Sequence, residues 1–336
     1  MIEVETVLIV GAGASCPYGF PTGERLRTEI IRLVETASVN STNKNGLHKF
    51  IERNSEPHLL RGFAHDFARS PRNSIDIFIE GRPEFAEVGK LAIAATLCGY
   101  EREKELCGNE KIRDEDWLKA LFNDYLVESG RKEEFGENKL KIITFNYDRS
   151  IEHRFTNDLL RTFGGTIEDA RELASKVEVI HVHGQLGNYF NSEGAPTIEF
   201  DSRTDERKLL QAADSISYFF EPGDEARLQK IRTTIAAAKR IGFLGFSYDS
   251  VNLKRIISPK VEGPLPENDR SMAEQKRDRL NKERLWKADR VSGTTFGLPA
   301  GRKARAKAFI EEVSRTEILF EDCKCRQFIE NTTIFI

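Results

Sequence analysis

The chain has 336 residues, of which 39% are hydrophobic and 31% are charged. This composition excludes a chain that is disordered throughout, and the length allows either one large α/β domain with an insertion or two compact domains. With 51 Lys and Arg against 54 Asp and Glu, the net charge of -3 gives no bulk electrostatic reason to expect nucleic acid or an anionic membrane as the main partner.

The apolar runs of this sequence are no longer than a strand, whereas a membrane helix needs roughly 18 to 20 apolar residues. Near the N-terminus, Glu3 and Glu5 stand where a secretory signal has Lys or Arg. Five cysteines without regular spacing are typical of free thiols in a reducing compartment. We therefore expect a cytoplasmic protein without a membrane-spanning segment.

Residues 6–10 form a β-rich apolar run that ends in a glycine turn, which predicts a buried parallel strand. A helix is predicted next, with a polar start at Thr22 and apolar residues such as Leu26 and Ile30 at helical spacing. From residue 40 to residue 137, apolar residues recur at helical spacing and no strand pattern is convincing. We interpret residues 40–137 as a helical insertion into a domain formed by residues 1–39 and 138–336.

The β pattern resumes at residues 139–145, 177–182 and 240–246, and each of these runs ends in a polar or glycine-containing turn. Helical patterns follow at about residues 151–160, 205–219 and 224–239. The carboxyl ends of parallel strands line one crevice in a doubly wound sheet, so polar residues at those ends can converge. The sequence thus predicts an α/β fold, a Rossmann-like doubly wound parallel sheet with a helical insertion.

Four of these turns carry the candidate chemistry: Gly11-Ala12-Gly13-Ala14-Ser15, Thr144-Phe145-Asn146-Tyr147-Asp148, His183-Gly184 and Gly245-Phe246-Ser247. Glycines in the first turn would let backbone amides approach a pyrophosphate, and the N-terminus of the following helix would favour its charge. The G-x-G-x-x-G dinucleotide fingerprint is broken, because Cys16 stands at its sixth position. An ordinary dehydrogenase is therefore disfavoured.

In this order, with a Gly19-Phe20-Pro21 turn after the first, the four turns resemble the signature of the sirtuin-like NAD-consuming family over residues 6 to about 255. The resemblance implies a crevice that binds NAD and cleaves its bond to nicotinamide. Asn146 and Asp148 would then lie by the nicotinamide ribose, and His183 would be the base near that ribose. The implied NAD contacts are Gly11, Ala12, Gly13, Ser15, Pro21, Thr144, Gly184, Gly245 and Ser247.

The chain also departs from the family pattern. Protein-deacylating members carry a zinc ribbon of two CxxC pairs after the His-Gly turn, but no cysteine lies between Cys107 and Cys323 here. We therefore expect no zinc, and water as the acceptor, so that NAD yields nicotinamide and ADP-ribose. The pattern is similar to the zinc-free bacterial branch, which implies an antiphage defence effector that depletes NAD when triggered.

Three other functions stay open at this stage. One is an NAD-dependent protein deacylase or ADP-ribosyltransferase, the second is a non-catalytic module that senses NAD or ADP-ribose, and the third is a structural subunit with a degenerate pocket. The turn residues also have purely structural interpretations: a ligand-free glycine turn at Gly11 and Gly13, and an Asx turn and helix cap at Asn146 and Asp148. For His181 we expect a packed, satisfied histidine, and for His183, at the strand end, the catalytic role.

The expected partners beyond NAD are further copies of this chain and a separate sensor or ATPase protein. Residues 270–307, which begin at Arg270 and end at Lys307, hold 12 basic and 4 acidic residues. Such a stretch is usually a solvated helix face, and contact with nucleic acid or a partner protein through it is the alternative. Phe296-Gly297 is interpreted as another strand end, near the adenine.

Overall fold

A six-stranded, fully parallel sheet is the centre of the molecule, with the strand order β3-β2-β1-β4-β5-β6. The computed structural model describes residues 1–39, 42, 44–72, 74–108, 112–190, 198–201, 205–218, 224–257 and 286–336. The strands are β1 (Thr6–Val10), β2 (Leu140–Thr144), β3 (Glu178–His181), β4 (Arg240–Leu244), β5 (Arg290–Thr294) and β6 (Ile318–Glu321). This is the Rossmann order, in which the direction of winding reverses between β1 and β4. The predicted fold class is confirmed.

Helices surround the sheet and extend beyond one end of it. Before β2 they are α1 (Gly23–Ser38), α2 (Gly46–Arg53), α3 (Pro57–Arg69), α4 (Ile75–Gly81), α5 (Ala86–Leu97), α6 (Glu103–Cys107), α7 (Trp117–Leu121), the π-helical η6 (Phe122–Leu126) and α8 (Glu134–Glu137). After β2 they are α9 (Ser150–Phe163), α10 (Ile167–Ala174), α11 (Glu206–Asp214), α12 (Asp224–Ala237), α13 (Ser250–Ile257), α15 (Ala300–Ser314) and α16 (Cys325–Asn331). Short 3₁₀ turns include η1 (Ala12–Ala14), η2 (Cys16–Tyr18), η3 (Pro83–Phe85) and η4 (Cys98–Tyr100).

Alternation along the strands divides the apolar core into two layers. In β1, Leu8 and Val10 join one buried cluster with α1, α5, α9 and α16, whereas Val7 and Ile9 join the other with α12, α13 and α15. Successive side chains of a strand point to opposite faces, so a strand that is apolar throughout buries both faces. All five residues of β1 are buried for this reason.

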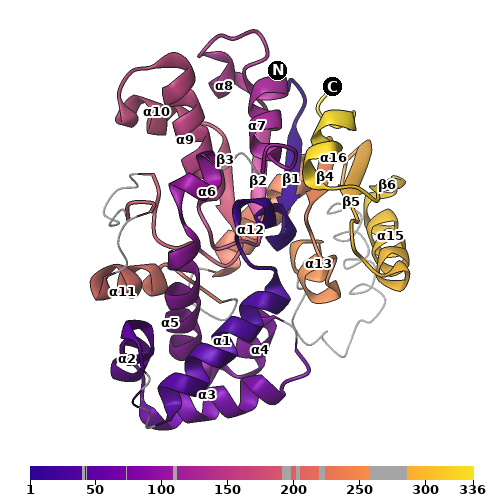
Figure 1. Ribbon diagram of the computed structural model, residues 1–336. Coiled ribbons are helices and arrows are strands. Elements are labelled where there is room, and N and C mark those ends of the chain that lie inside the picture. The colour runs from indigo at the N-terminus through magenta and orange to yellow at the C-terminus, as the bar shows by residue number, and fades with distance from the viewer. Residues whose placement is uncertain are drawn as a thin grey trace.

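A helical lobe lies beyond the carboxyl ends of the strands, below the sheet in Figure 1. It contains α1 to α5, and α11 packs on α5 although it comes much later in the chain. The other helices of the predicted insertion lie beside the sheet, where α7 contacts α16 and α8 contacts α10. The boundaries of the insertion, residues 40–137, stay a prediction.

The limits of individual elements can be compared with those predicted from the sequence. Four strands lie within a residue or two of their predicted limits, and β5 ends at Thr294, close to the predicted strand end. The sequence analysis missed β6 and α10. Residues 191–197 and 258–285 lie outside the described residues, and with them residues 270–285 of the basic stretch. Within the part of the chain that the structure covers, no helix has the length and apolarity to cross a membrane.

Candidate functional site

The turns after β1 and β4 pack directly on each other at the point where the winding reverses. The Gly11 amide donates to Leu244 O at 3.0 Å, and the Gly13 amide donates to Gly245 O at 3.0 Å. Gly245 has a φ of +55°, and a Cβ there would lie 2.1 Å from the Ala14 nitrogen. Only glycine meets both demands, since left-handed backbone and backbone contact both exclude a side chain.

This packing changes the interpretation of the glycine turn. The Ala14 amide donates to Gly11 O and the Ser15 amide to Ala12 O, so four amides of the turn already have backbone partners. Helix α1 begins only at Gly23, after two 3₁₀ turns, and is capped by the Thr22 hydroxyl. In this conformation the amides of Gly11 and Gly13 therefore hold two loops together and are not directed at a pyrophosphate.

The turn after β2 joins the glycine turn through a buried polar cluster. Asn146 Nδ2 donates to Ser15 Oγ at 2.9 Å and to Gly11 O at 3.2 Å, and Ser15 Oγ donates to Asp148 Oδ2 at 2.9 Å. Asn146 Oδ1 is buried and accepts no hydrogen bond from any described residue. An unpaired buried carbonyl costs roughly 1–3 kcal/mol, which a bound group would recover.

Asp148 also forms an Asx turn just before a helix. Its Oδ1 accepts from the Ser150 amide at 3.2 Å and from the Ser150 hydroxyl, at the first residue of α9. Burial raises the pKa of Asp148, and the hydrogen bonds from Ser150 and Ser15 oppose that rise. The N-cap residue of α9 is Arg149, without a side-chain cap, so the structure shows the expected Asx turn but not a cap at Asp148. A ribose hydroxyl would have to share this carboxylate.

His181 holds the backbone of the same turn. Its Nδ1 lies 2.8 Å from Asn146 O, and its Nε2 lies 2.8 Å from Glu152 Oε1 on α9. Burial lowers the pKa of His181, but the Glu152 charge and these hydrogen bonds outweigh burial, so its pKa is raised. His181 is thus a satisfied, buried histidine, as predicted.

His183 lies at the end of β3 under α4. Its ring is near those of Phe145 and Tyr147, at centroid distances of 5.9 and 6.0 Å, and its Nδ1 is 4.0 Å from Asp76 Oδ1. Burial lowers the pKa of His183 to about 4, the Asp76 charge opposes this, and the charges of Arg255 and Arg227 add to it. The imidazole is therefore neutral at neutral pH.

Gly184 allows the chain to turn sharply after His183. Its φ is +72°, and a Cβ there would lie 2.2 Å from Ser215 O. The Ser217 amide donates to His183 O at 3.0 Å, so the segment after α11 fixes the backbone on both sides of this turn. The backbone conformation after His183 thus explains why glycine occupies position 184.

The predicted site residues divide into an exposed and a buried set. Gly13 and Ser247 are exposed, and Ala12, Gly184 and Gly245 are partly exposed, whereas Gly11, Ser15, Pro21, Thr144 and His183 are buried. The rings of Phe145 and Phe246 are tilted to each other, with centroids 5.0 Å apart. Of the residues expected at the phosphates, Gly13 is thus exposed but Gly11 and Ser15 are not. The residues expected at the nicotinamide ribose, Asn146, Asp148 and His183, are all buried.

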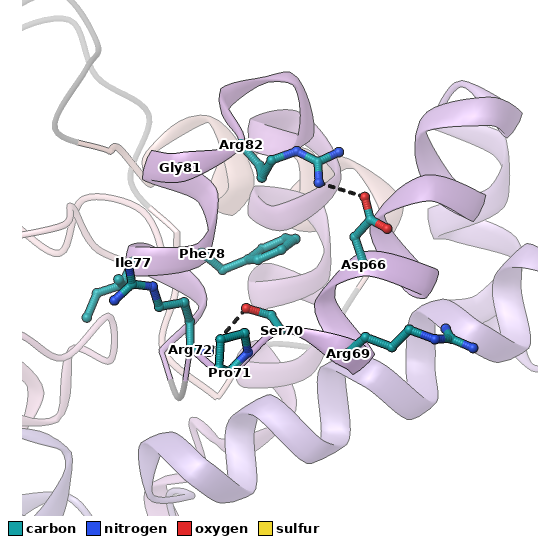
Figure 2. A pocket seen from close by; sticks show the side chains of 9 residues that line it. All are labelled: Asp66, Arg69, Ser70, Pro71, Arg72, Ile77, Phe78, Gly81 and Arg82. Atoms are coloured by element: carbon teal, nitrogen blue, oxygen red, sulfur yellow. Dashed lines mark hydrogen bonds and ion pairs between the residues drawn. The ribbon is translucent and has the colours of Figure 1, made fainter.

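The sequence analysis missed the residues that cover the buried end. Asp76 and Glu80, one turn apart on α4, contact Tyr147 and Arg255 respectively. Two carboxylates at positions i and i+4 are unusual in a helix that buries the apolar Ile75, Phe78 and Ile79. This pattern could have indicated from the sequence that α4 contacts polar partners. A cavity of about 370 Å³ lies on the far side of α4, against α3, and includes none of the predicted residues (Figure 2).

Cys16 lies directly after the glycine turn. Cys16 is half buried, its Sγ lies 3.4 Å from Ala12 O, and burial raises its pKa, so the thiol is protonated at neutral pH. Among the described residues no group of three or more His, Cys, Asp or Glu side chains is placed to hold a metal ion.

Comparison with known proteins gives a limited result. No family model matches the sequence, and no curated protein matches it. Two solved structures are similar over most of the chain. One is a Sir2 homolog–NAD complex with 15% identity and a TM-score of 0.36, covering 98% of this chain and 88% of that one. The other is a structure described as the structural basis of sirtuin substrate affinity. It has 13% identity and a TM-score of 0.34, and the match covers 97% of this chain and 91% of that one. At these values neither assigns a function to this chain.

Proposed function

We propose that the crevice at the carboxyl ends of β1 to β4 binds NAD and hydrolyses its glycosidic bond to give nicotinamide and ADP-ribose. The observation that carries the proposal is the buried Asn146 Oδ1, which has no partner among the described residues and lies beside Ser15 and Asp148 at the reversal point of the sheet. Ligands of doubly wound folds bind at this point.

The residues of the buried end suit the two demands of this reaction. Asn146 would orient a water molecule through Oδ1 without adding charge, while its Nδ2 stays fixed by Ser15 and Gly11. Water attacks ribose C1′, the electron pair of the broken C–N bond leaves with nicotinamide, and the proton released by the water passes to neutral His183. An oxocarbenium-like transition state gains most from groups held in place before it forms.

The resemblance of the four turns to the zinc-free sirtuin-like branch supports a role as an antiphage effector that depletes NAD. On the same basis we propose further copies of the chain and a separate sensor or ATPase protein as partners. Two alternatives remain as proposals, a protein deacylase or ADP-ribosyltransferase and a non-catalytic NAD or ADP-ribose sensor.

The test is to incubate the purified chain with NAD and to separate the products by chromatography, with and without an acyl-lysine peptide or an acceptor protein. We expect nicotinamide and ADP-ribose from NAD alone. Asn146→Ala and His183→Ala should each lower nicotinamide release at least 100-fold, which is the usual contribution of a positioned acid–base group. Asn54→Ala and His48→Ala, at the two ends of α2, are the matched controls and should keep the wild-type rate.

The products also distinguish the alternatives. Nicotinamide release that requires the peptide or the acceptor protein would favour a transferase or deacylase. Saturable NAD binding without any product would favour the sensor. Wild-type rates in both Asn146→Ala and His183→Ala would exclude the proposed mechanism.

A further inference from the structure

The buried end of the crevice is closed to a substrate in this structure. Asn146 is 8% exposed, Asp148 is 7% exposed and His183 is 2% exposed. His183 is the most enclosed of the three, so a dinucleotide contacts its ring only if the residues around it move. Asp76 of α4 lies 4.0 Å from His183 Nδ1, which makes α4 one element whose movement would expose this ring.

Two carboxylates connect α4 to the strand-end loops. Asp76 Oδ1 accepts from the Tyr147 hydroxyl and lies 4.0 Å from His183 Nδ1, while Asp76 Oδ2 accepts from Ser74 Oγ at 2.7 Å. One turn later, Glu80 forms an ion pair with Arg255 of α13. The Arg255 side chain is largely buried, and burial lowers its pKa despite the Glu80 and Asp76 charges.

The opposite face of α4 is held differently. Phe78 packs against Phe63 and Phe67 of α3 and stacks on Phe85 of η3, with centroid distances between 4.8 and 6.0 Å. The Arg82–Asp66 ion pair, 2.7 Å long, also joins this segment to α3 (Figure 2). The aromatic cluster and the Arg82–Asp66 pair thus hold α4 to the helical lobe, whereas Asp76 and Glu80 are its polar links to Tyr147 and Arg255.

That difference determines which interface can open. Separating an aromatic cluster exposes apolar area to water, at roughly 25 cal/mol per Å². When the Glu80–Arg255 contact opens, water or another anion can replace the lost partner of each charge, which no solvent molecule does for a separated aromatic cluster. Movement of α4 with its lobe would take Glu80 away from Arg255, whose guanidinium keeps its hydrogen bond to Asn252 Oδ1 at 2.9 Å.

We propose that α4 is an internal competitor of the substrate: Glu80 occupies Arg255, which binds a phosphate of the dinucleotide when α4 moves away, and Asp76 covers His183. This inference rests on the proposed function for the identity of the ligand. The movement of α4 is inferred from its contacts and does not depend on the proposed function. A phosphate suits a guanidinium because two of its oxygens can accept the two parallel N–H groups of the planar guanidinium.

The experiment measures ligand binding and helix opening separately. ADP-ribose, which contains the diphosphate but no labile glycosidic bond to nicotinamide, is titrated calorimetrically into the full chain. We expect Glu80→Gln to bind it at least 10-fold more tightly than the wild type, and Arg255→Met to abolish that gain in the double variant. Glu84→Gln is the matched control, since Glu84 pairs with Arg82 and does not face the crevice.

Hydrogen exchange of the α4 amides tests the movement without any ligand. These amides should exchange at least 5-fold faster in Glu80→Gln and in Asp76→Asn than in the wild type or in Glu84→Gln, while the β1 amides are unchanged. Circular dichroism identifies a variant that has not folded. If either Glu80→Gln or Asp76→Asn does not fold, the exchange rates of the other variant test the movement. Unchanged α4 exchange in a folded variant overturns the proposal.

Tight ADP-ribose binding that Glu80→Gln does not improve, or that Arg255→Met does not weaken, also overturns the proposal. If no variant binds ADP-ribose while α4 exchange responds as expected, the movement stands and the proposed function fails. The two proposals can therefore fail independently of each other.

Discussion

Individual residues of the crevice meet demands of folding and of the proposed chemistry at the same time. Asp148 forms an Asx turn with Ser150 through one carboxylate oxygen and accepts from Ser15 with the other. Gly184 is required by its backbone conformation, whatever binds nearby. A structural role and a ligand role therefore do not exclude each other at these positions, and function has to be tested by a measurement other than stability.

His183 makes a pH prediction at this scale. The pKa of His183 in the folded chain is lowered to about 4. As the pH falls, the imidazole of the unfolded chain is therefore protonated at a higher pH than that of the folded chain. Its contribution to stability is complete above pH ~6.5 and is lost as the pH decreases toward 4, by about 2 kcal/mol between pH 7 and pH 5. Urea unfolding at both pH values should show a smaller loss in His183→Gln. An equal loss in the two proteins would contradict the burial of a neutral imidazole.

At the scale of elements, local sequence determines where several helices begin. Thr166 accepts from the Asp169 amide at 3.1 Å, and the Asp169 carboxylate accepts in return from the Thr166 amide at 3.2 Å. This capping box defines the start of α10, a helix that the sequence analysis missed because it is short and follows α9 closely.

The capping box gives a prediction for α10. Thr166→Ala removes the hydroxyl acceptor and should lower the free energy of unfolding by about 1 kcal/mol. Thr166→Ser retains the acceptor and should cost much less. Chemical denaturation measures both, and equal effects of the two substitutions would show that the hydroxyl does not stabilise the helix start.

At the scale of the whole molecule, a buried ion pair joins segments far apart in the sequence. Arg149, at the start of α9, donates to Glu101 through Nε at 3.0 Å and through its amide at 3.1 Å. Its guanidinium also donates to Ile198 O. Both charged side chains are buried, so each depends on the other for compensation.

This pair predicts unequal effects of single and double substitutions. Arg149→Met leaves the Glu101 charge buried without its partner and should destabilise the protein by about 3 kcal/mol or more. The double variant Arg149→Met/Glu101→Leu removes both charges and should recover at least half of that loss. Denaturant midpoints of the three proteins measure the coupling, and a double variant less stable than Arg149→Met would contradict it.

Most of the sheet could be predicted from the sequence. Strands such as β1 and β4 are short apolar runs that end in glycine or polar turns, and their order along the chain implies one edge at which those turns meet. Strand β6 could not be found in this way. It has four residues, lies at the sheet edge and exposes Leu319, so burial imposes little pattern on it.

The candidate site was predictable only in part. Asn146, Asp148 and Ser15 form the cluster that their turns suggested, and His183 lies at the predicted end of β3. The amide partners of Gly11 and Gly13 could not be predicted, because they lie on the β4 turn, more than 200 residues away. The same limit applies to Asp76, whose contact with Tyr147 joins a helix of the lobe to a loop of the sheet.

The sequence by itself determined the identity of β1 to β4, the turns that end them and the polar side chains that those turns carry, because each depends on neighbours within a few residues. Tertiary structure alone decided that the glycine amides bind a second loop and that α4 covers His183. These outcomes depend on which distant segments meet in space, and burial, not local propensity, sets the charge state of the groups enclosed there.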